Sequence, residues 1–206
     1  LAAPWEKGQG SRTRPRVRGG GYGVGCVEGD PVLDVDAKVA QVAAAAKGAG
    51  ARLGIALPEI HMEPGRSIVG DAGLTLYTVG TVKEIPGYKN YVSVDGGMPD
   101  NPRFALYGAS YTCLLANKLD QPAEFPCSVV GRCCESGDII QEHVLLPGRV
   151  GRGDILAVCT TGAYNYSMAS NYNRLPRPPI VMLRGGNESY VAVRRESLED
   201  LCRNDL

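Results

Sequence analysis

From about Gly73 onward, the sequence consists of short segments rich in Val, Ile, Thr and Tyr, each bounded by Gly, Pro or Asn. The segments are LTLYTVGTVKEI, NYVSVDGG, EFPCSVVGRC, DILAVCTTGAY, PIVMLR and SYVAVRRE. Such segments favour strands, and long helical stretches are missing from this part. RGGNES predicts a hairpin turn, and SLEDLCRNDL predicts a short closing helix capped by Ser197 and Asp200. We therefore predict an antiparallel β-barrel or sandwich over residues 73–206.

Residues 19–72 follow a different pattern. GGGYGVG is a backbone with almost no side chains, and the stretch after it, DVDAKVAQVAAAAKGAG, has many alanines and apolar residues at helical spacing. We expect a helix here that Asp34 caps and that Gly48 or Gly50 ends. RLGIALPEIHMEPGR then predicts a short strand that stops at Pro64-Gly65. One αβ unit therefore separates two glycine-containing loops.

The charge balance and the apolar pattern limit the class of protein. Lys plus Arg and Asp plus Glu each number 22, which gives no electrostatic case for a nucleic-acid or membrane partner and points to a small ligand. No apolar run approaches the roughly 20 residues of a membrane span, and no signal-peptide pattern is visible, so we expect a cytoplasmic protein. The seven irregularly spaced cysteines predict reduced thiols, and His61 and His143 lack metal-ligand spacing. We expect no metal site.

The first eighteen residues carry arginines at alternate positions in SRTRPRVR. On a strand these guanidinium groups would line one face, which suits an exposed edge or a phosphate-binding arm rather than a buried strand. Two interpretations remain open, a solvated tail and a contact with nucleic acid.

The two glycine-containing loops, GGGYG and EPGR, have the composition of a phosphate site. Loops that follow parallel strands converge at one face of an α/β barrel, where phosphate groups are often bound. Glycines let backbone N–H groups approach phosphate oxygens, Arg66 offers a guanidinium fork, and Glu63 offers a carboxylate that can face a cofactor ring nitrogen. Each loop taken alone is a weak signal, because three glycines more often form a tight turn.

Three further segments carry candidate site residues. Arg103 and Tyr107 lie four apart in DNPRFALYGA, so on a helix they share a face and can hold a carboxylate together, or form a surface charge and a packed ring. The loop GAYNYSMASNYN places tyrosines where one can stack on an aromatic cofactor or pack at the core: Tyr164, Tyr166 and Tyr172. CCESGD, residues 133–138, has residue types shared by metal sites, redox sites, turns and substrate loops, so the segment alone does not decide.

Taken together and in this order, GGGYG, EPGRSIVG, DGGMPDNPRFALYGA, CESGD and GAYNYSMASNYNRLPRP resemble the diaminopimelate decarboxylase family of fold-type III enzymes, which use pyridoxal 5′-phosphate. The resemblance runs from about Gly19 to the end of the chain. CESGD in particular resembles this family, whereas ornithine decarboxylases usually carry Cys-Asp there. The implied fold is α/β plus β: the last strands of a cofactor-binding (β/α)8 barrel over residues 19–72, then a C-terminal antiparallel β-barrel like that of alanine racemase over residues 73–206.

The resemblance also implies roles for individual residues. The cofactor phosphate would be bound by Gly19, Gly20, Gly21, Glu63, Gly65 and Arg66. Tyr164 would lie against the cofactor and the substrate, while Arg66, Arg103 and Tyr107 would hold the distal carboxylate of the substrate. Cys134, as a catalytic residue, and Glu135, pairing with the distal amine, would reach into the active site of the partner subunit in a homodimer.

The implied reaction is the decarboxylation of meso-diaminopimelate to L-lysine, the last step of lysine biosynthesis. Two departures qualify the resemblance. A complete α/β barrel takes about 250 residues, but only residues 19–72 are available for it here. None of the six lysines matches the family's cofactor-holding motif. TRPRVR also lacks the continuous apolar pattern of a barrel strand, so residues 1–18 are expected to form an atypical basic tail. We expect a C-terminal fragment, inactive alone; the alternatives are a non-catalytic interaction or regulatory protein, or a related amino-acid decarboxylase.

Overall fold

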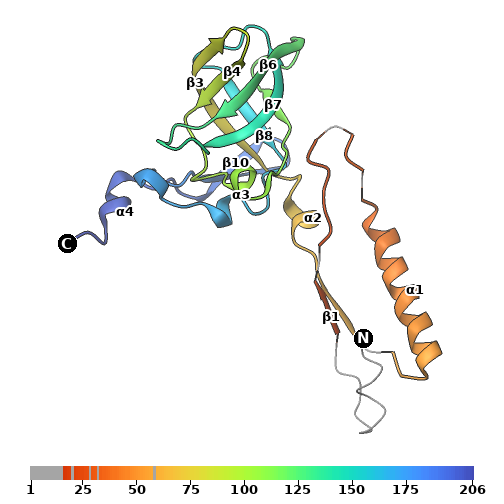
Figure 1. The fold of residues 1–206 in the computed structure, drawn as a ribbon. Helices are drawn as coiled ribbons and strands as arrows, with labels where there is room; N and C mark the ends of the chain where they lie inside the picture. Colours follow the sequence, from red (N-terminus) through yellow and green to blue (C-terminus); the bar gives the residue numbers. More distant parts are fainter. Residues whose placement is uncertain (1–15, 20, 28, 32, 58) are drawn as a thin grey trace.

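The computed structural model describes residues 16–19, 21–27, 29–31, 33–57 and 59–206 of the 206-residue chain. A six-stranded barrel occupies one end of the molecule, and two short parallel strands with a long helix extend from it (Figure 1). The expectations for Gly20 and for the tail up to residue 15 lie outside the described residues. No helix in the described ranges is long and apolar enough to cross a membrane.

The barrel is built from one sheet with strand order β5-β8-β3-β4-β6-β7. Its edge strands β5 and β7 contact each other, so the sheet is nearly closed. The strands are β3 (Leu74–Ile85), β4 (Lys89–Val94), β5 (Cys113–Leu115), β6 (Ala123–Val130), β7 (Ile139–Pro147) and β8 (Ile155–Cys159). A β-barrel is confirmed for residues 74–159, whereas the prediction extended it to residue 206.

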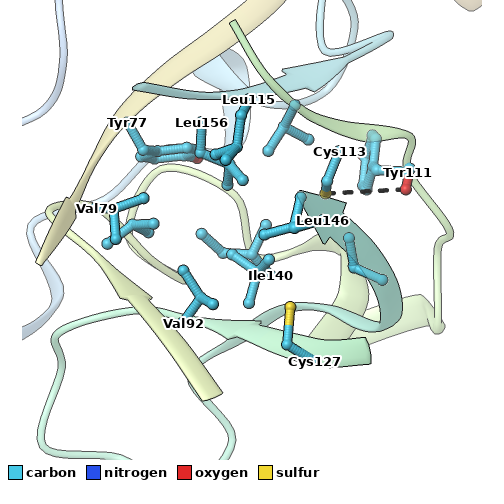
Figure 2. Close-up of a cluster of buried hydrophobic side chains, with 14 residues drawn as sticks. Tyr77, Val79, Val92, Tyr111, Cys113, Leu115, Cys127, Ile140, Leu146 and Leu156 are labelled. Carbon is cyan, nitrogen blue, oxygen red and sulfur yellow. Dashed lines mark hydrogen bonds between the residues drawn. The ribbon is translucent and has the colours of Figure 1, made fainter. Parts of the chain in front are cut away.

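The core of this barrel follows the alternation of side chains along each strand. Tyr77 and Val79 on β3 point inward, as do Val92 and Val94 on β4, and they meet apolar side chains from the other strands (Figure 2). Successive side chains of a strand point to opposite faces, so a period of two places one set inside. The apolar segments between residues 74 and 159 therefore form the strands of this barrel, and their inward-facing side chains form its core.

One pairing in the barrel differs from the predicted antiparallel sheet. β4 pairs with β6 in parallel, with Tyr91 opposite Ser128, while the other neighbouring pairs are antiparallel. The chain leaves β4, forms helix α3 (Arg103–Tyr107) and strand β5, and only then returns as β6. This crossover sends β6 in the same direction as β4, which parallel pairing requires. The expectation of a purely antiparallel barrel was wrong at this point.

The N-terminal unit consists of β1 (Arg16–Gly19), α1 (Val35–Leu53) and β2 (Ile60–Glu63). β1 and β2 pair in parallel, so the expected αβ unit is present, and β1 begins inside the segment expected to form a tail. Asp34 caps α1 as predicted, accepting the Ala37 N–H at 2.9 Å. The helix continues past Gly48 and Gly50 to a left-handed C-cap at Gly54, so the predicted end was wrong. A Cβ at Gly50 would lie 3.3 Å from the Ile55 carbonyl oxygen, which shows that this glycine permits close packing rather than termination.

The N-terminal unit meets the barrel through short helix α2 (Arg66–Val69), which lies between them in Figure 1. The loop after β8 runs directly against the segment after α2: the Thr161 N–H donates to the Gly73 carbonyl at 2.9 Å and the Gly162 N–H to the Gly70 carbonyl at 3.0 Å. A Cβ on Gly162 would lie 1.8 Å from the Val69 carbonyl oxygen. Only glycine allows this approach, which seats the loop carrying Tyr164 on α2.

The C-terminal region forms a separate two-stranded ribbon and a short helix. β9 (Ile180–Arg184) and β10 (Glu188–Val193) are antiparallel, and the turn between them has positive φ at Gly185 and Gly186, as expected for a hairpin. Helix α4 (Leu198–Cys202) begins with the predicted capping box of Ser197 and Asp200. Two 3₁₀ turns, η1 (Tyr166–Met168) and η2 (Tyr172–Arg174), lie in the polar loop between β8 and β9.

Candidate cofactor and substrate site

Two loops begin where the parallel strands β1 and β2 end. Gly19 and Glu63 are register partners, so the glycine loop and the Pro64-Gly65-Arg66 segment leave the same edge of this sheet. Gly21 has φ 65°, a left-handed conformation that favours glycine, and a Cβ there would meet nothing within 4 Å. The Glu63 side chain is exposed. Backbone and guanidinium donors therefore gather at one open edge.

Tyr164 lies close to both arginines of the predicted site. Its ring centroid is 5.2 Å from Cζ of Arg66 and 5.3 Å from Cζ of Arg103. A Cβ at Gly65 would lie 3.1 Å from the Tyr164 hydroxyl oxygen, so this glycine leaves room for the tyrosine. Tyr164 has φ 65° and remains 47% exposed. A bulky residue in the left-handed region is strained, and such strain is concentrated at functional sites.

Helix α3 brings Arg103 and Tyr107 together, as the four-residue spacing predicted. Cζ of Arg103 is 5.2 Å from the Tyr107 ring centroid, and Nη1 is 3.9 Å from Sδ of Met168. The Nε atom of Arg103 is buried and has no hydrogen-bond partner among the described residues. A buried donor without a partner costs free energy. An anionic ligand would satisfy it, as a water molecule also would.

Tyr111, which lies next to Arg103, and its hydrogen-bond partner Asn165 were not predicted as site residues from the sequence. Tyr111 is 3% exposed and its hydroxyl group donates to Oδ1 of Asn165 at 3.5 Å. Burial raises the pKa of Tyr111, and the adjacent Arg103 guanidinium opposes the rise. Asn165 also has a buried Nδ2 without a partner in the described part of the chain. Tyr111 has no local sequence signal, whereas Asn165 lies in the tyrosine-rich loop.

The charge of this cluster is positive. Neither Arg66 nor Arg103 forms an ion pair with any residue that the structure describes. Two guanidinium groups close to one tyrosine ring attract anions, and their planar forks suit phosphate and carboxylate oxygens. The cluster of Arg66, Arg103, Tyr107 and Tyr164, called the arginine–tyrosine cluster below, is suited to a ligand that carries both.

The Cys133–Asp138 loop lies on the barrel rim between β6 and β7. Oε1 of Glu135 accepts the Gly137 N–H at 3.0 Å, and Oε2 accepts the Tyr172 hydroxyl at 3.3 Å. These donors, the Gly137 amide first, lower the pKa of Glu135, which keeps it a carboxylate. Cys134 is exposed, and no hydrogen bond or ion pair among the described residues joins Glu135 to the arginine–tyrosine cluster.

The two cysteines of this loop differ in exposure. No group of three or more potential metal ligands occurs within the described residues, and both Cys133 and Cys134 are free thiols. Burial, with the Asp138 carboxylate second, raises the pKa of the Cys133 thiol to about 12. A thiol with such a pKa stays protonated and unreactive. Of the two thiols, only that of Cys134 is exposed.

Asp138 closes this loop and ties it to the segment before α3. Its Oδ1 accepts the Met98 N–H at 2.6 Å, and its Oδ2 accepts the Cys133 N–H at 2.7 Å. The carboxylate is 4% exposed and leaves no room for side chains at Gly97 and Gly131, where a Cβ would lie 2.4 and 2.2 Å from its oxygens. One buried aspartate therefore joins the loop of Glu135 to the loop that leads to Arg103.

Replacing Gly131 with alanine is expected to destabilise the chain by about 1–3 kcal/mol, the usual cost of overpacking. The added methyl group would collide with the Asp138 carboxylate. Urea denaturation of the 206-residue chain measures the loss, with Gly148→Ala as the control because a Cβ at Gly148 meets nothing within 4 Å. Equal unfolding midpoints for the two variants would contradict the packing argument.

Comparison with known proteins places this geometry in a family. Residues 31–162 match the family described as pyridoxal-dependent decarboxylase, C-terminal sheet domain. The diaminopimelate decarboxylase of Bacillus subtilis is 50% identical over 188 residues, covering 91% of this chain and 42% of the relative. That of Staphylococcus aureus is 48% identical over 201 residues, covering 98% and 47%.

Solved structures of decarboxylases also resemble the fold of this chain. The diaminopimelate decarboxylase of M. jannaschii in complex with L-lysine superposes with a TM-score of 0.82 at 30% identity, covering 94% of this chain and 43% of that one. A lysine/ornithine decarboxylase from Vibrio vulnificus, complexed with cadaverine, gives a TM-score of 0.64 at 25% identity, covering 80% and 42%.

The chain spans less than half the length of the curated relatives it matches. The family match nevertheless covers well over half of this chain and includes helix α1, α3 and the barrel strands β3 to β8. The chain therefore belongs to the pyridoxal-dependent decarboxylases and carries their C-terminal sheet domain.

Proposed function

We propose that this chain is the C-terminal part of a diaminopimelate decarboxylase, which uses pyridoxal 5′-phosphate to convert meso-diaminopimelate into L-lysine. The observation that carries the proposal is the arginine–tyrosine cluster, in which two guanidinium groups without ion-pair partners in the described chain lie close to one exposed tyrosine ring. The identity of about half to two diaminopimelate decarboxylases supports the same conclusion.

The residues at the edge of β1 and β2 suit the phosphate of the cofactor. Backbone N–H groups of Gly19, Gly20, Gly21 and Gly65 and the Arg66 fork would hold it, with Glu63 beside them and the Tyr164 ring against the cofactor. Gly20 lies outside the described residues, and Gly65 leaves the space that the tyrosine occupies. The bound cofactor supplies an electron sink for the carbon that loses carbon dioxide.

The substrate is a diamino-dicarboxylate, and each end would be held by a different group. Arg66, Arg103 and Tyr107 bind the distal carboxylate through charge-assisted hydrogen bonds, and the unpartnered Nε of Arg103 is one available donor. Glu135 pairs with the distal amine, and Cys134 provides the catalytic thiol beside it. The protein's contribution is to orient the substrate so that the correct carboxylate leaves.

Domain organisation and partners are part of the same proposal. Residues 19–72 form the last part of a (β/α)8 barrel, residues 73–206 the sheet domain, and residues 1–18 a basic tail from which β1 emerges. Cys134 and Glu135 serve the site of a partner subunit in a cytoplasmic homodimer, without a nucleic-acid partner. Cys134 and Glu135 are exposed, and within the described residues no hydrogen bond or ion pair joins Glu135 to the arginine–tyrosine cluster, which supports the dimer.

A hybrid enzyme tests the proposed function. In it, this chain replaces the matching 188-residue region of the Bacillus subtilis relative, whose remaining sequence supplies the rest of the enzyme. We expect carbon dioxide release and L-lysine formation from meso-diaminopimelate, and much slower turnover of L-ornithine and L-lysine. Faster turnover of ornithine would instead favour a related decarboxylase, the class of the Vibrio vulnificus neighbour.

The 206-residue chain alone is expected to release no carbon dioxide and to form no borohydride-reducible adduct with pyridoxal phosphate at a defined lysine. In the described part of the chain, the lysines lie on α1, on the β3–β4 hairpin and in the loop after β5, outside the loop that carries Tyr164. Mass spectrometry after reduction provides the measurement. Stoichiometric labelling of one lysine would contradict the expectation, whereas a folded, inactive hybrid would favour the alternative of an interaction or regulatory protein.

A further inference from the structure

The Glu135 carboxylate is oriented by contacts to both of its oxygens. The Gly137 N–H and the Ser136 hydroxyl group donate to Oε1 at 3.0 and 3.3 Å, and both belong to its own loop. The Tyr172 hydroxyl group, which donates to Oε2 at 3.3 Å, comes from the distant η2 turn. Among the residues that the structure describes, Tyr172 is therefore the hydrogen-bond donor that fixes this carboxylate relative to another part of the fold.

The η2 turn itself is held in a strained conformation. Asn173 and Arg174, directly after Tyr172, both have positive φ, at 54° and 58°. Two successive residues other than glycine rarely adopt the left-handed region, and they persist there only when surrounding contacts determine them. The direction of the Tyr172 side chain therefore depends on what holds this turn.

The C-terminal segment supplies those contacts. Arg174 forms an ion pair with Asp205 and donates to the Leu201 carbonyl at 3.3 Å. On the other side of the turn, Glu196 accepts Nδ2 of Asn171 at 2.6 Å, and it binds Arg177 through the backbone N–H at 2.8 Å and the guanidinium at 2.6 and 2.8 Å. Residues 196–205 thus hold the turn from both ends.

We infer that Tyr172 is a positioning residue for Glu135, kept in place by the C-terminal segment 196–205. The inference rests on the proposed function, in which Glu135 binds the distal amine of the substrate. A carboxylate held at both oxygens before binding loses less freedom when the amine arrives, so its orientation contributes to substrate selection. The C-terminal segment would then influence specificity without touching the substrate.

The first test uses the 206-residue chain and needs no catalysis. The pKa of Glu135 is measured by NMR titration of its labelled carboxyl carbon in the wild type, Tyr172→Phe, Arg174→Ala and Tyr88→Phe. The Gly137 amide and, second, the Tyr172 hydroxyl lower the pKa of Glu135, so we expect Tyr172→Phe to raise this pKa part of the way toward its ordinary value and Arg174→Ala to raise it less. Tyr88 is an exposed tyrosine on the β3–β4 hairpin and should change nothing. An unchanged Glu135 pKa in Tyr172→Phe would overturn the inference.

The second test uses the hybrid enzyme. Loss of one hydrogen bond should raise KM for meso-diaminopimelate about 3- to 10-fold in Tyr172→Phe with little change in kcat. In a Glu135→Gln background the same change should have almost no further effect, because the two residues act together. Additive losses would overturn the inference. If every hybrid is inactive, the proposed function fails, and the titration alone still decides the role of Tyr172.

Discussion

Replacing Arg103 with alanine in the hybrid enzyme is expected to lower kcat/KM for meso-diaminopimelate by a factor of about 30 to several thousand. This range corresponds to about 2–5 kcal/mol, the cost of truncating one partner of a buried, hydrogen-bonded charge pair. Arg103 has a buried Nε without a partner in the described chain, and its guanidinium stands against the rings of Tyr107 and Tyr164. Steady-state kinetics with the purified variant provide the measurement.

Replacing Arg103 with lysine separates the contribution of the positive charge to substrate binding from that of the planar guanidinium geometry. Arg103→Lys keeps the positive charge but loses the planar fork, so we expect a loss of about tenfold or more, smaller than that of alanine. Arg152→Lys is the matched control, because Arg152 is exposed in the turn before β8, away from the arginine–tyrosine cluster. If Arg103→Lys matched the wild type in KM, the residue would be only a surface charge.

Features encoded locally could be predicted from the sequence. The β-rich segments, the Asp34 cap, the glycine hairpin turn and the Ser197–Asp200 capping box all depend on residues within a few positions of one another, and each appears in the structure. Alternation of apolar residues fixes which face of a strand is buried whatever its neighbours are. The same reasoning does not reveal strand order, so the parallel pairing of β4 and β6 was missed.

Features that depend on distant neighbours could not be predicted in this way. Gly48 or Gly50 was expected to end α1, but the helix continues to Leu53, and the lack of a side chain at Gly50 serves packing against Ile55. Asp138 was part of a motif whose role stayed open, and its partners Met98 and Cys133 become visible only in three dimensions. Tyr111 gave no signal at all. Roles for the arginine–tyrosine cluster came from family resemblance, and the structure adds the distances between its members.

Glutamine at position 135 provides the second large expected effect, a loss of discrimination between substrates. In the hybrid enzyme, Glu135→Gln should lower kcat/KM for meso-diaminopimelate on the order of tenfold to several hundredfold, because under the proposed function the distal amine loses its charged partner. A dicarboxylate amino acid of similar length without the distal amine should be affected much less. The ratio of kcat/KM for the two compounds measures the specificity that the carboxylate provides.

The size of this effect depends on Glu135 being ionised before the substrate arrives. Donation from the Gly137 amide, the Tyr172 hydroxyl and the Ser136 hydroxyl lowers the pKa of Glu135 below that of an ordinary glutamate. The side chain is therefore negatively charged throughout the neutral pH range. Glu142→Gln is the matched control, since Glu142 pairs with Lys89 on the barrel wall. An equal fall in kcat/KM for both compounds, or no fall in Glu135→Gln, would show that this carboxylate does not recognise the amine.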